Sequence, residues 1–112
     1  MSETTTIPET IRPMKAAAWM DRAWPEGGNA FSEFAAFVEK KGALEPKTRA
    51  LILLVATSLQ RCPHCVDHHL ETLKKLGATN SEIAEAMMLG SVAAAGANMA
   101  WTAEVFHKRL FH

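Results

Sequence analysis

Two cysteines lie three positions apart in the stretch Cys62-Pro63-His64-Cys65, and they are the only cysteines among 112 residues. Two histidines, His68 and His69, follow within seven positions of the first cysteine. A dithiol this close can form a disulfide, bind a metal, or use one thiolate as a nucleophile and the other to resolve the product. Which of these chemistries applies depends on the secondary structure that positions the two cysteines.

The pair is predicted to lie at the beginning of a helix. Proline suits the first helical position, so Pro63 opens the helix and Cys62 takes the cap position. The helix is expected to run to Leu76 and to stop at Gly77. Free backbone N–H groups and the positive end of the helix dipole favour a thiolate over a thiol at this place. We therefore expect a reactive dithiol.

A candidate base lies on the same face of this helix. At about 100° per residue, Cys62, Cys65 and His69 share one face. His69 can therefore accept a proton from a neighbouring thiol or hold a water that does so. His64 points roughly to the opposite side of the helix, and His68 lies off the shared face.

Other interpretations of the cysteine pair stay open at this point. The tetrapeptide C-P-H-C also occurs in oxidoreductases of thioredoxin fold, but there it follows a strand, whereas Ala50 to Gln60 has a helical pattern. Zinc could use both cysteines and a histidine, but structural zinc sites usually take a second ligand pair from a distant segment. The two cysteines could also be inert and simply buried. We expect no metal at the pair.

The chain is predicted to be all-α, with about six helices, because helix-forming residues dominate and no alternating β-branched run appears. We expect Pro25 and Gly27-Gly28 to end a first helix, Gly42 to close a second in the left-handed conformation, and Gly90 and Gly96 to mark a break or a close helix contact. The expected helices begin at Pro13, Asn29, Pro46, Pro63, Thr79 and about Asn98. The third contains Leu51 to Ala56, which is apolar all round and is therefore expected to be buried on every side, partly by another subunit.

Composition narrows the class of protein. Twelve Lys plus Arg balance twelve Asp plus Glu, which excludes the basic surface that nucleic-acid binding needs. The N-terminus lacks the pattern of a signal peptide, and the longest strongly apolar run, Leu51 to Ala56, is too short to span a membrane. We expect a cytoplasmic protein with no membrane partner, formed by an extended or disordered tail, residues 1–12, and one domain, residues 13–112. A near-neutral, apolar-rich chain also favours self-association.

A longer stretch of the chain resembles a known superfamily. Residues 44–76 read LEPKTRALILLVATSLQRCPHCVDHHLETLKKL, followed by GATNSEIAEA at residues 77–86 and a small-residue segment at 93–97. This order resembles the carboxymuconolactone decarboxylase and alkylhydroperoxidase D superfamily, with its helix leading into C-x-x-C-x-x-x-H. The similarity covers about residues 13–108.

The resemblance implies an all-α fold that assembles as a homotrimer or homohexamer. In the peroxidase-type members, a dithiol reduces hydroperoxides and an external dithiol donor then reduces the resulting disulfide. Carried over by position, Cys65 is the thiolate that attacks the peroxide and Cys62 is the more accessible, resolving thiol. His69 serves in the proton relay, and His64 occupies the position of a further relay histidine. No cofactor beyond the external dithiol is implied.

One position departs from the superfamily pattern. The relay glutamate of the family is replaced here by Ala50, which cannot transfer a proton, and Glu45 is the candidate substitute. The first hypothesis is therefore a thiol-dependent peroxidase or disulfide reductase that acts on a small hydroperoxide or disulfide. The alternatives are a decarboxylase that acts on a small carboxylated lactone, and a redox-sensing oligomer without turnover.

Overall fold

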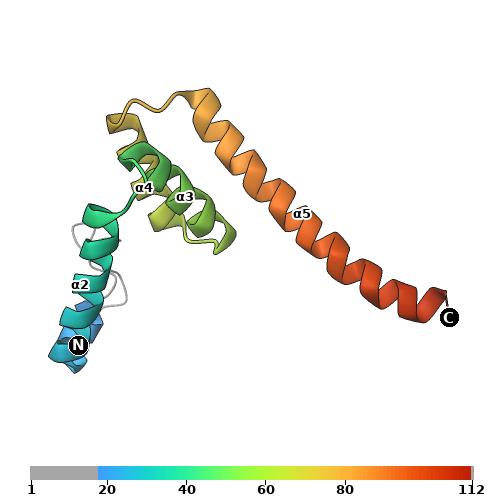
Figure 1. Ribbon diagram of the computed structural model, residues 1–112, viewed down its shortest axis with the longest axis horizontal. Helices are drawn as coiled ribbons and strands as arrows, with labels where there is room; N and C mark the ends of the chain where they lie inside the picture. Colours follow the sequence, from blue (N-terminus) through green and yellow to red (C-terminus); the bar gives the residue numbers. More distant parts are fainter. Residues whose placement is uncertain (1–17, 112) are drawn as a thin grey trace. The chain divides into compact units, whose positions relative to one another are not determined.

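The computed structural model describes residues 18–111, and within them all regular secondary structure is helical (Figure 1). The prediction of an all-α fold is confirmed, and residues 18–111 form five helices, where about six were expected for the whole chain. They are α1 (Ala18–Ala23), α2 (Pro25–Lys41), α3 (Pro46–Leu59), α4 (Pro63–Lys75) and α5 (Asn80–Leu110). The expected tail, residues 1–12, and the expected helix start at Pro13 lie outside the described residues. The chain divides into two compact units, one ending at Glu45 and the other beginning at Pro46.

In the first unit, α1 packs against α2. Pro25 opens α2 instead of ending a helix, and the glycine pair lies inside α2, so the predicted boundary at Gly27-Gly28 and the predicted cap at Asn29 are wrong. Gly28 is buried, and a Cβ at this position would come within 2.9 Å of the backbone of Asp21 in α1. Gly28 therefore lets two helix backbones approach each other, and the glycine pair does not end a helix.

The end of α2 also differs from the prediction. Gly42 follows the helix with φ −70° and ψ 158°, which is extended backbone rather than the expected left-handed conformation. The chain therefore leaves α2 in a conformation that any residue can adopt. Pro46 then begins α3, as predicted.

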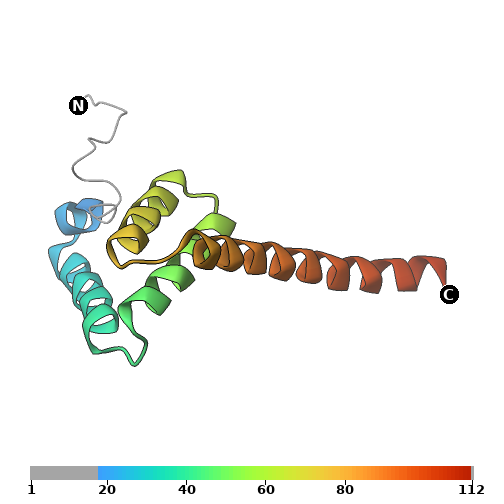
Figure 2. The same ribbon diagram turned by 90° about the horizontal axis from the view of Figure 1, so that it is seen from above.

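In the second unit, α3 packs against both α4 and α5 (Figures 1 and 2). Ala50 and Leu54 of α3 and Leu73 of α4 form the buried core among the described residues. Partly buried apolar residues surround them: Leu51, Val66, Leu70, Ala78 and Ile83. In the single chain the apolar centre of α3 is covered on one side only, and Ile52 is 51% exposed. That another subunit covers the rest stays a prediction.

The connection from α4 to α5 agrees with the sequence signals. Gly77 has φ +81°, a left-handed conformation that glycine adopts at little cost and that ends the helix. Thr79 and Glu82 form the predicted capping box: the Thr79 hydroxyl accepts from the Glu82 N–H at 3.1 Å, and Glu82 accepts from the Thr79 N–H at 2.9 Å. Glu82 also accepts a hydrogen bond from Lys47 of α3 at 3.0 Å, which ties the start of α5 to α3.

Helix α5 is continuous over 31 residues. The predicted break at Gly90 or Gly96 is absent, and the helix expected from about Asn98 is the second half of α5. Gly90 is instead the close helix contact that was the alternative, because a Cβ there would lie 2.9 Å from Cγ1 of Val55. No such contact lies beside Gly96, where a Cβ would meet no other atom of the described chain.

By length and composition alone, α5 could also cross a membrane. One such helix is weak evidence for a membrane protein. No long uninterrupted apolar run marks α5 in the sequence, because polar residues interrupt its small and apolar ones.

Candidate dithiol site

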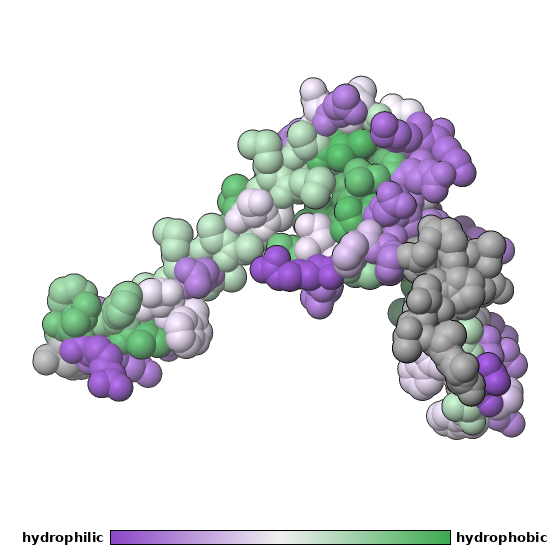
Figure 3. Space-filling view, turned by 180° about the vertical axis from the view of Figure 1, so that it is seen from behind, coloured by the Kyte–Doolittle hydropathy of each residue, from purple (hydrophilic) through white to green (hydrophobic). Residues whose placement is uncertain are grey.

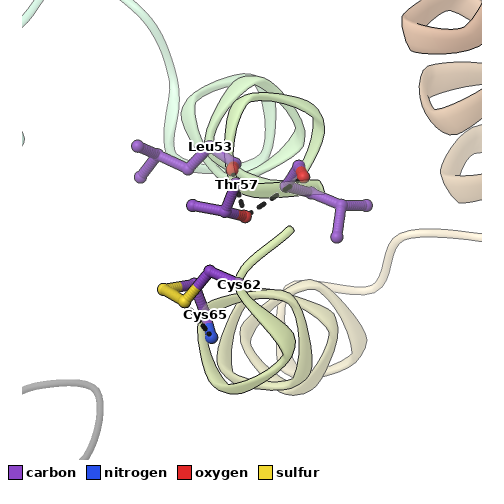
Figure 4. The surroundings of a disulfide bond; sticks show 5 residues. Leu53, Thr57, Cys62 and Cys65 are labelled. Atoms are coloured by element: carbon purple, nitrogen blue, oxygen red, sulfur yellow. Dashed lines mark hydrogen bonds between the residues drawn. A yellow bond between two sulfur atoms is a disulfide. The ribbon is translucent and has the colours of Figure 1, made fainter. Parts of the chain in front are cut away.

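Cys62 and Cys65 form a disulfide at the start of α4, with their Cα atoms 5.3 Å apart (Figure 4). Cys62 is the N-cap residue, Pro63 opens the helix, and the backbone N–H of Cys65 donates to Sγ of Cys62 at 3.3 Å. The predicted helix start, cap and proline position are therefore confirmed. Both sulfur-bearing residues are half-buried, so the pair lies close to solvent at the end of a helix.

The end of α3 holds Cys62 in place. The backbone N–H of Cys62 donates to the carbonyl of Thr57 at 3.1 Å, and the Thr57 hydroxyl donates to the carbonyl of Leu53 at 2.7 Å (Figure 4). Arg61, directly before the dithiol, has φ +60°, which is the left-handed region that non-glycine residues rarely adopt. Its N–H donates to the carbonyl of Ser58 at 3.0 Å, so a tight turn leads from α3 into the cap.

Sequence reasoning missed Thr57 and Arg61. The contribution of Thr57 is a backbone carbonyl, which leaves no signal in side-chain type. Arg61 occupies a position where glycine is the usual residue, and so the turn carries no glycine signature.

The three histidines lie within α4, as predicted. Their roles in proton transfer are not tested by the contacts described below. His69 is half-buried, and its ring lies edge-on to that of His68 with centroids 5.3 Å apart. His64 is exposed in the first turn of α4. The role of His69 as proton acceptor for the thiols therefore stays a prediction.

The two positions considered for a relay acid differ sharply in their surroundings. Ala50 is 5% exposed and packs in the core with Leu54 and Leu73. Glu45 is exposed and comes directly before α3. Within the second unit, the position where the family pattern has glutamate is therefore part of an apolar core.

Two further features bear on ligand binding. Among the described residues, no group of three or more histidine, cysteine, aspartate or glutamate side chains is arranged to hold a metal ion. An apolar groove of about 630 Å³ runs between α3 and α5, with Leu51, Val55 and Leu59 on one wall and Ala86 and Leu89 on the other. Its lining includes neither cysteine and none of the three histidines of α4.

Comparison with known proteins identifies the family. The Carboxymuconolactone decarboxylase family matches residues 25–108, which span α2 to α5 and contain the whole dithiol site. The chain belongs to the carboxymuconolactone decarboxylase family. The resemblance seen in the sequence is thereby confirmed.

Two known proteins are similar to this carboxymuconolactone decarboxylase family member. The chain is 33% identical over 76 residues to a Paracoccus denitrificans protein named "Uncharacterized protein 4 in cox locus", and the matched region covers 68% of each chain. It is also similar to a crystal structure of a Methanobacterium thermoautotrophicum protein from a structural genomics programme. That similarity has a TM-score of 0.70 and 28% identity, and covers 76% of this chain and 96% of the other.

Proposed function

We propose that this carboxymuconolactone decarboxylase family member is a cytoplasmic thiol-dependent redox enzyme that reduces small hydroperoxides, or related disulfides, at the Cys62–Cys65 pair. The observation that carries the proposal is the disulfide at the N-terminus of α4, formed by the only two cysteines of the chain. Disulfides are rare in a reducing compartment unless they are transient, catalytic or redox-sensing. A half-buried pair at a helix cap suits such a transient bond.

The reduced pair supplies the two electrons of the reaction. The Cys65 thiol gives its proton to His69, and the thiolate attacks the terminal oxygen of the hydroperoxide. The O–O bond breaks, the alkoxide takes the proton back from His69 and leaves as an alcohol, and Cys65 becomes a sulfenic acid. The Cys62 thiol then attacks the Cys65 sulfur, which releases water and forms the disulfide.

An external dithiol completes the cycle by exchange with the Cys62–Cys65 disulfide, and becomes a disulfide itself. The half-buried position of Cys62 at the helix cap supports access by such a donor. Ala50 lies in the core and cannot transfer a proton, and Glu45, the candidate substitute for the relay acid, is exposed. His64, exposed beside the pair, is the further histidine assigned to the relay.

The proposal is tested by following hydroperoxide consumption in the presence of a dithiol. The expected result is turnover by the wild type and none by Cys65→Ser. Without added dithiol, Cys62→Ser should consume about one equivalent of peroxide and stop at the Cys65 sulfenic acid, because no intramolecular disulfide can form. Ser91→Ala is the matched control: the Ser91 hydroxyl donates to the carbonyl of Met87 in its own helix, at 3.4 Å, and turnover should be unchanged.

Three outcomes would contradict the proposal. Peroxide turnover that persists in Cys65→Ser would remove the dithiol from the mechanism. If the wild type consumes one equivalent of peroxide and no dithiol then reduces its disulfide, the redox-sensing oligomer is supported instead. Decarboxylation of a carboxylated lactone that survives Cys62→Ser would support the lyase named in the family.

A further inference from the structure

Cys62 belongs to two helix ends at once. Its backbone N–H donates to the Thr57 carbonyl at 3.1 Å. The preceding residue Arg61, with φ +60°, donates from its own N–H to the Ser58 carbonyl at 3.0 Å. These two bonds around a left-handed residue form the Schellman motif, which closes many helices and here closes α3. Since the side chain of Cys62 also caps α4, the cysteine is fixed from both helices.

The same motif places the Thr57 side chain in the surroundings of the dithiol. The residue that donates the last N–H of a Schellman motif commonly packs against the residue whose carbonyl accepts it. Here these residues are Cys62 and Thr57, and both are half-buried. Figure 4 shows Thr57 on the side of α3 that faces the Cys62–Cys65 disulfide. A hydroxyl group of α3 therefore lies beside the cap of α4.

In the disulfide form, the Thr57 hydroxyl donates to carbonyls of its own helix. The distances are 2.7 Å to Leu53 and 3.2 Å to Leu54 (Figure 4). Both carbonyls also accept backbone N–H groups from four residues further along α3, so neither depends on the hydroxyl for a partner. Side-chain bonds of this kind tend to destabilise a helix slightly. The Thr57 hydroxyl can therefore turn to a stronger acceptor at little cost to α3.

Reduction of the disulfide creates a stronger acceptor. A neutral sulfur accepts hydrogen bonds weakly, whereas a thiolate carries a negative charge. Hydrogen bonds to a charged acceptor are about twice as strong as those between neutral groups. Sγ of Cys62 already accepts from the backbone N–H of Cys65 at 3.3 Å, and a thiolate there has room for a further donor.

We propose that Thr57 is a further member of the dithiol site: when the pair is reduced, its hydroxyl turns from the α3 carbonyls and donates to the Cys62 thiolate. The proposal rests on the redox function proposed above, because it concerns the reduced form of the pair. Cys62 then accepts from the first turn of α4 and from the last turn of α3. More of Cys62 is ionised at neutral pH, in the form that attacks the oxidised Cys65.

The pH dependence of Cys62 alkylation by iodoacetamide tests the proposal. Cys65→Ser is the background, because it leaves a single titrating thiol and keeps the backbone N–H at position 65. In this background, Thr57→Val keeps the shape of the side chain and removes the hydroxyl. It should raise the pKa of the Cys62 thiol by about 1, as expected for the loss of one hydrogen bond to a charged group. Thr57→Ser keeps the hydroxyl and should retain the pH profile of the parent.

A second threonine gives the matched control. Thr102 is also half-buried, and its hydroxyl donates at 2.7 Å to the carbonyl of Asn98, four residues earlier in α5. Thr102→Val should therefore leave the Cys62 profile unchanged. Thr57 does not line the apolar groove between α3 and α5, a region where Figure 3 shows apolar surface. Thr57→Val thus leaves the lining of that groove as it is.

Two outcomes would overturn the proposal. One is a Cys62 profile that is the same in Thr57→Val as in its parent, even if the variant is less stable. The other is an equal shift in Thr57→Ser, because loss of the methyl group would then be the cause.

The alkylation measurement uses no peroxide, and so it separates this proposal from the proposed function. A shifted profile in Thr57→Val together with no hydroperoxide turnover by the wild type would support the role of Thr57 and overturn the peroxidase. Normal turnover with an unshifted profile would overturn the role of Thr57 alone.

Discussion

The backbone N–H of Cys65 donates a hydrogen bond to Sγ of Cys62, over 3.3 Å. A free backbone N–H at the N-terminus of α4 therefore points at the sulfur of Cys62, the cap residue, rather than at that of Cys65. After reduction, this contact favours negative charge on Cys62. Cys65, which the family resemblance makes the attacking residue, then depends on another group to accept its proton.

This arrangement predicts different reactivities for the two thiols. In the reduced protein at neutral pH, iodoacetamide should modify Cys62 several times faster than Cys65, as measured by mass spectrometry of timed samples. Cys65→Ser should leave the modification rate of Cys62 nearly unchanged. Faster modification of Cys65 would show that the cap hydrogen bond does not decide which sulfur carries the charge.

A His69 variant distinguishes the effect of the proton acceptor from the effect of the cap hydrogen bond. His69→Ala should slow the reaction of the reduced protein with hydroperoxide by about 10²-fold, in the range typical of general acid–base catalysis. It should not change the alkylation rate of Cys62, because the N–H donor to Cys62 is backbone. Equal slowing of both reactions would indicate a general structural effect rather than loss of a proton acceptor.

Restoring glutamate at position 50 should destabilise the protein rather than activate it. Ala50 is 5% exposed and packs against Leu54 and Leu73, so an added carboxylate would have no polar partner in this core. We expect a loss of roughly 2–4 kcal/mol in the free energy of unfolding at pH 7, measured by urea titration. Ala50→Gln is the control with matched shape.

The pH dependence distinguishes charge from volume in that pair of variants. The deficit of Ala50→Glu relative to Ala50→Gln should shrink as the pH falls, because protonation removes the buried charge. Equal deficits at all pH values would mean that overpacking alone causes the loss. Peroxide turnover raised above wild type by Ala50→Glu would show that the assembled protein presents this position to the site.

The capping carboxylate of α5 predicts a pH-dependent contribution to stability. The pKa of Glu82 lies below its ordinary value of 4.5, first because it accepts from the Thr79 backbone N–H and then because Lys47 donates to it. A carboxyl group with a lowered pKa in the folded state stabilises that state above the ordinary pKa, and the contribution is lost as the pH falls through the lowered value. The thermal midpoint of Glu82→Gln should therefore lie below that of wild type at pH 7, and the two should converge in acid. If the two thermal midpoints still differ at a pH below both the ordinary and the lowered pKa of Glu82, the charge of Glu82 is not the cause of the difference.

Two left-handed residues predict stability changes of opposite sign. Arg61, with φ +60°, sits in the turn before the dithiol, and Arg61→Gly should stabilise the protein by about 0.5–1 kcal/mol. Gly77 has φ +81° and nothing within 4 Å of an added Cβ, so Gly77→Ala should cost about 1 kcal/mol through backbone strain alone. Urea titration measures both. If Arg61→Gly is destabilising, contacts of the arginine side chain outweigh the strain of its backbone.

Features that depend on a few neighbouring residues could be predicted from the sequence. Pro63 after Cys62, Gly77, and the Thr79–Glu82 capping box each define a helix end through local hydrogen bonds and allowed dihedral angles. The helix ends predicted at Gly27-Gly28 and Gly90 are absent. Another helix lies against Gly28 and against Gly90, and packing there outweighs a propensity cost of about 1 kcal/mol.

The sequence by itself determined the helical class, the family, and the dithiol with its cap, because these follow from residue type and short spacing. Tertiary structure decided what the sequence could not. Val55 of α3 lies against Gly90, which marks a close helix contact within α5 rather than a break, and Ala50 lies in the core between α3 and α4. These outcomes depend on which helices meet, and helix contacts join residues far apart in the chain that no local pattern connects.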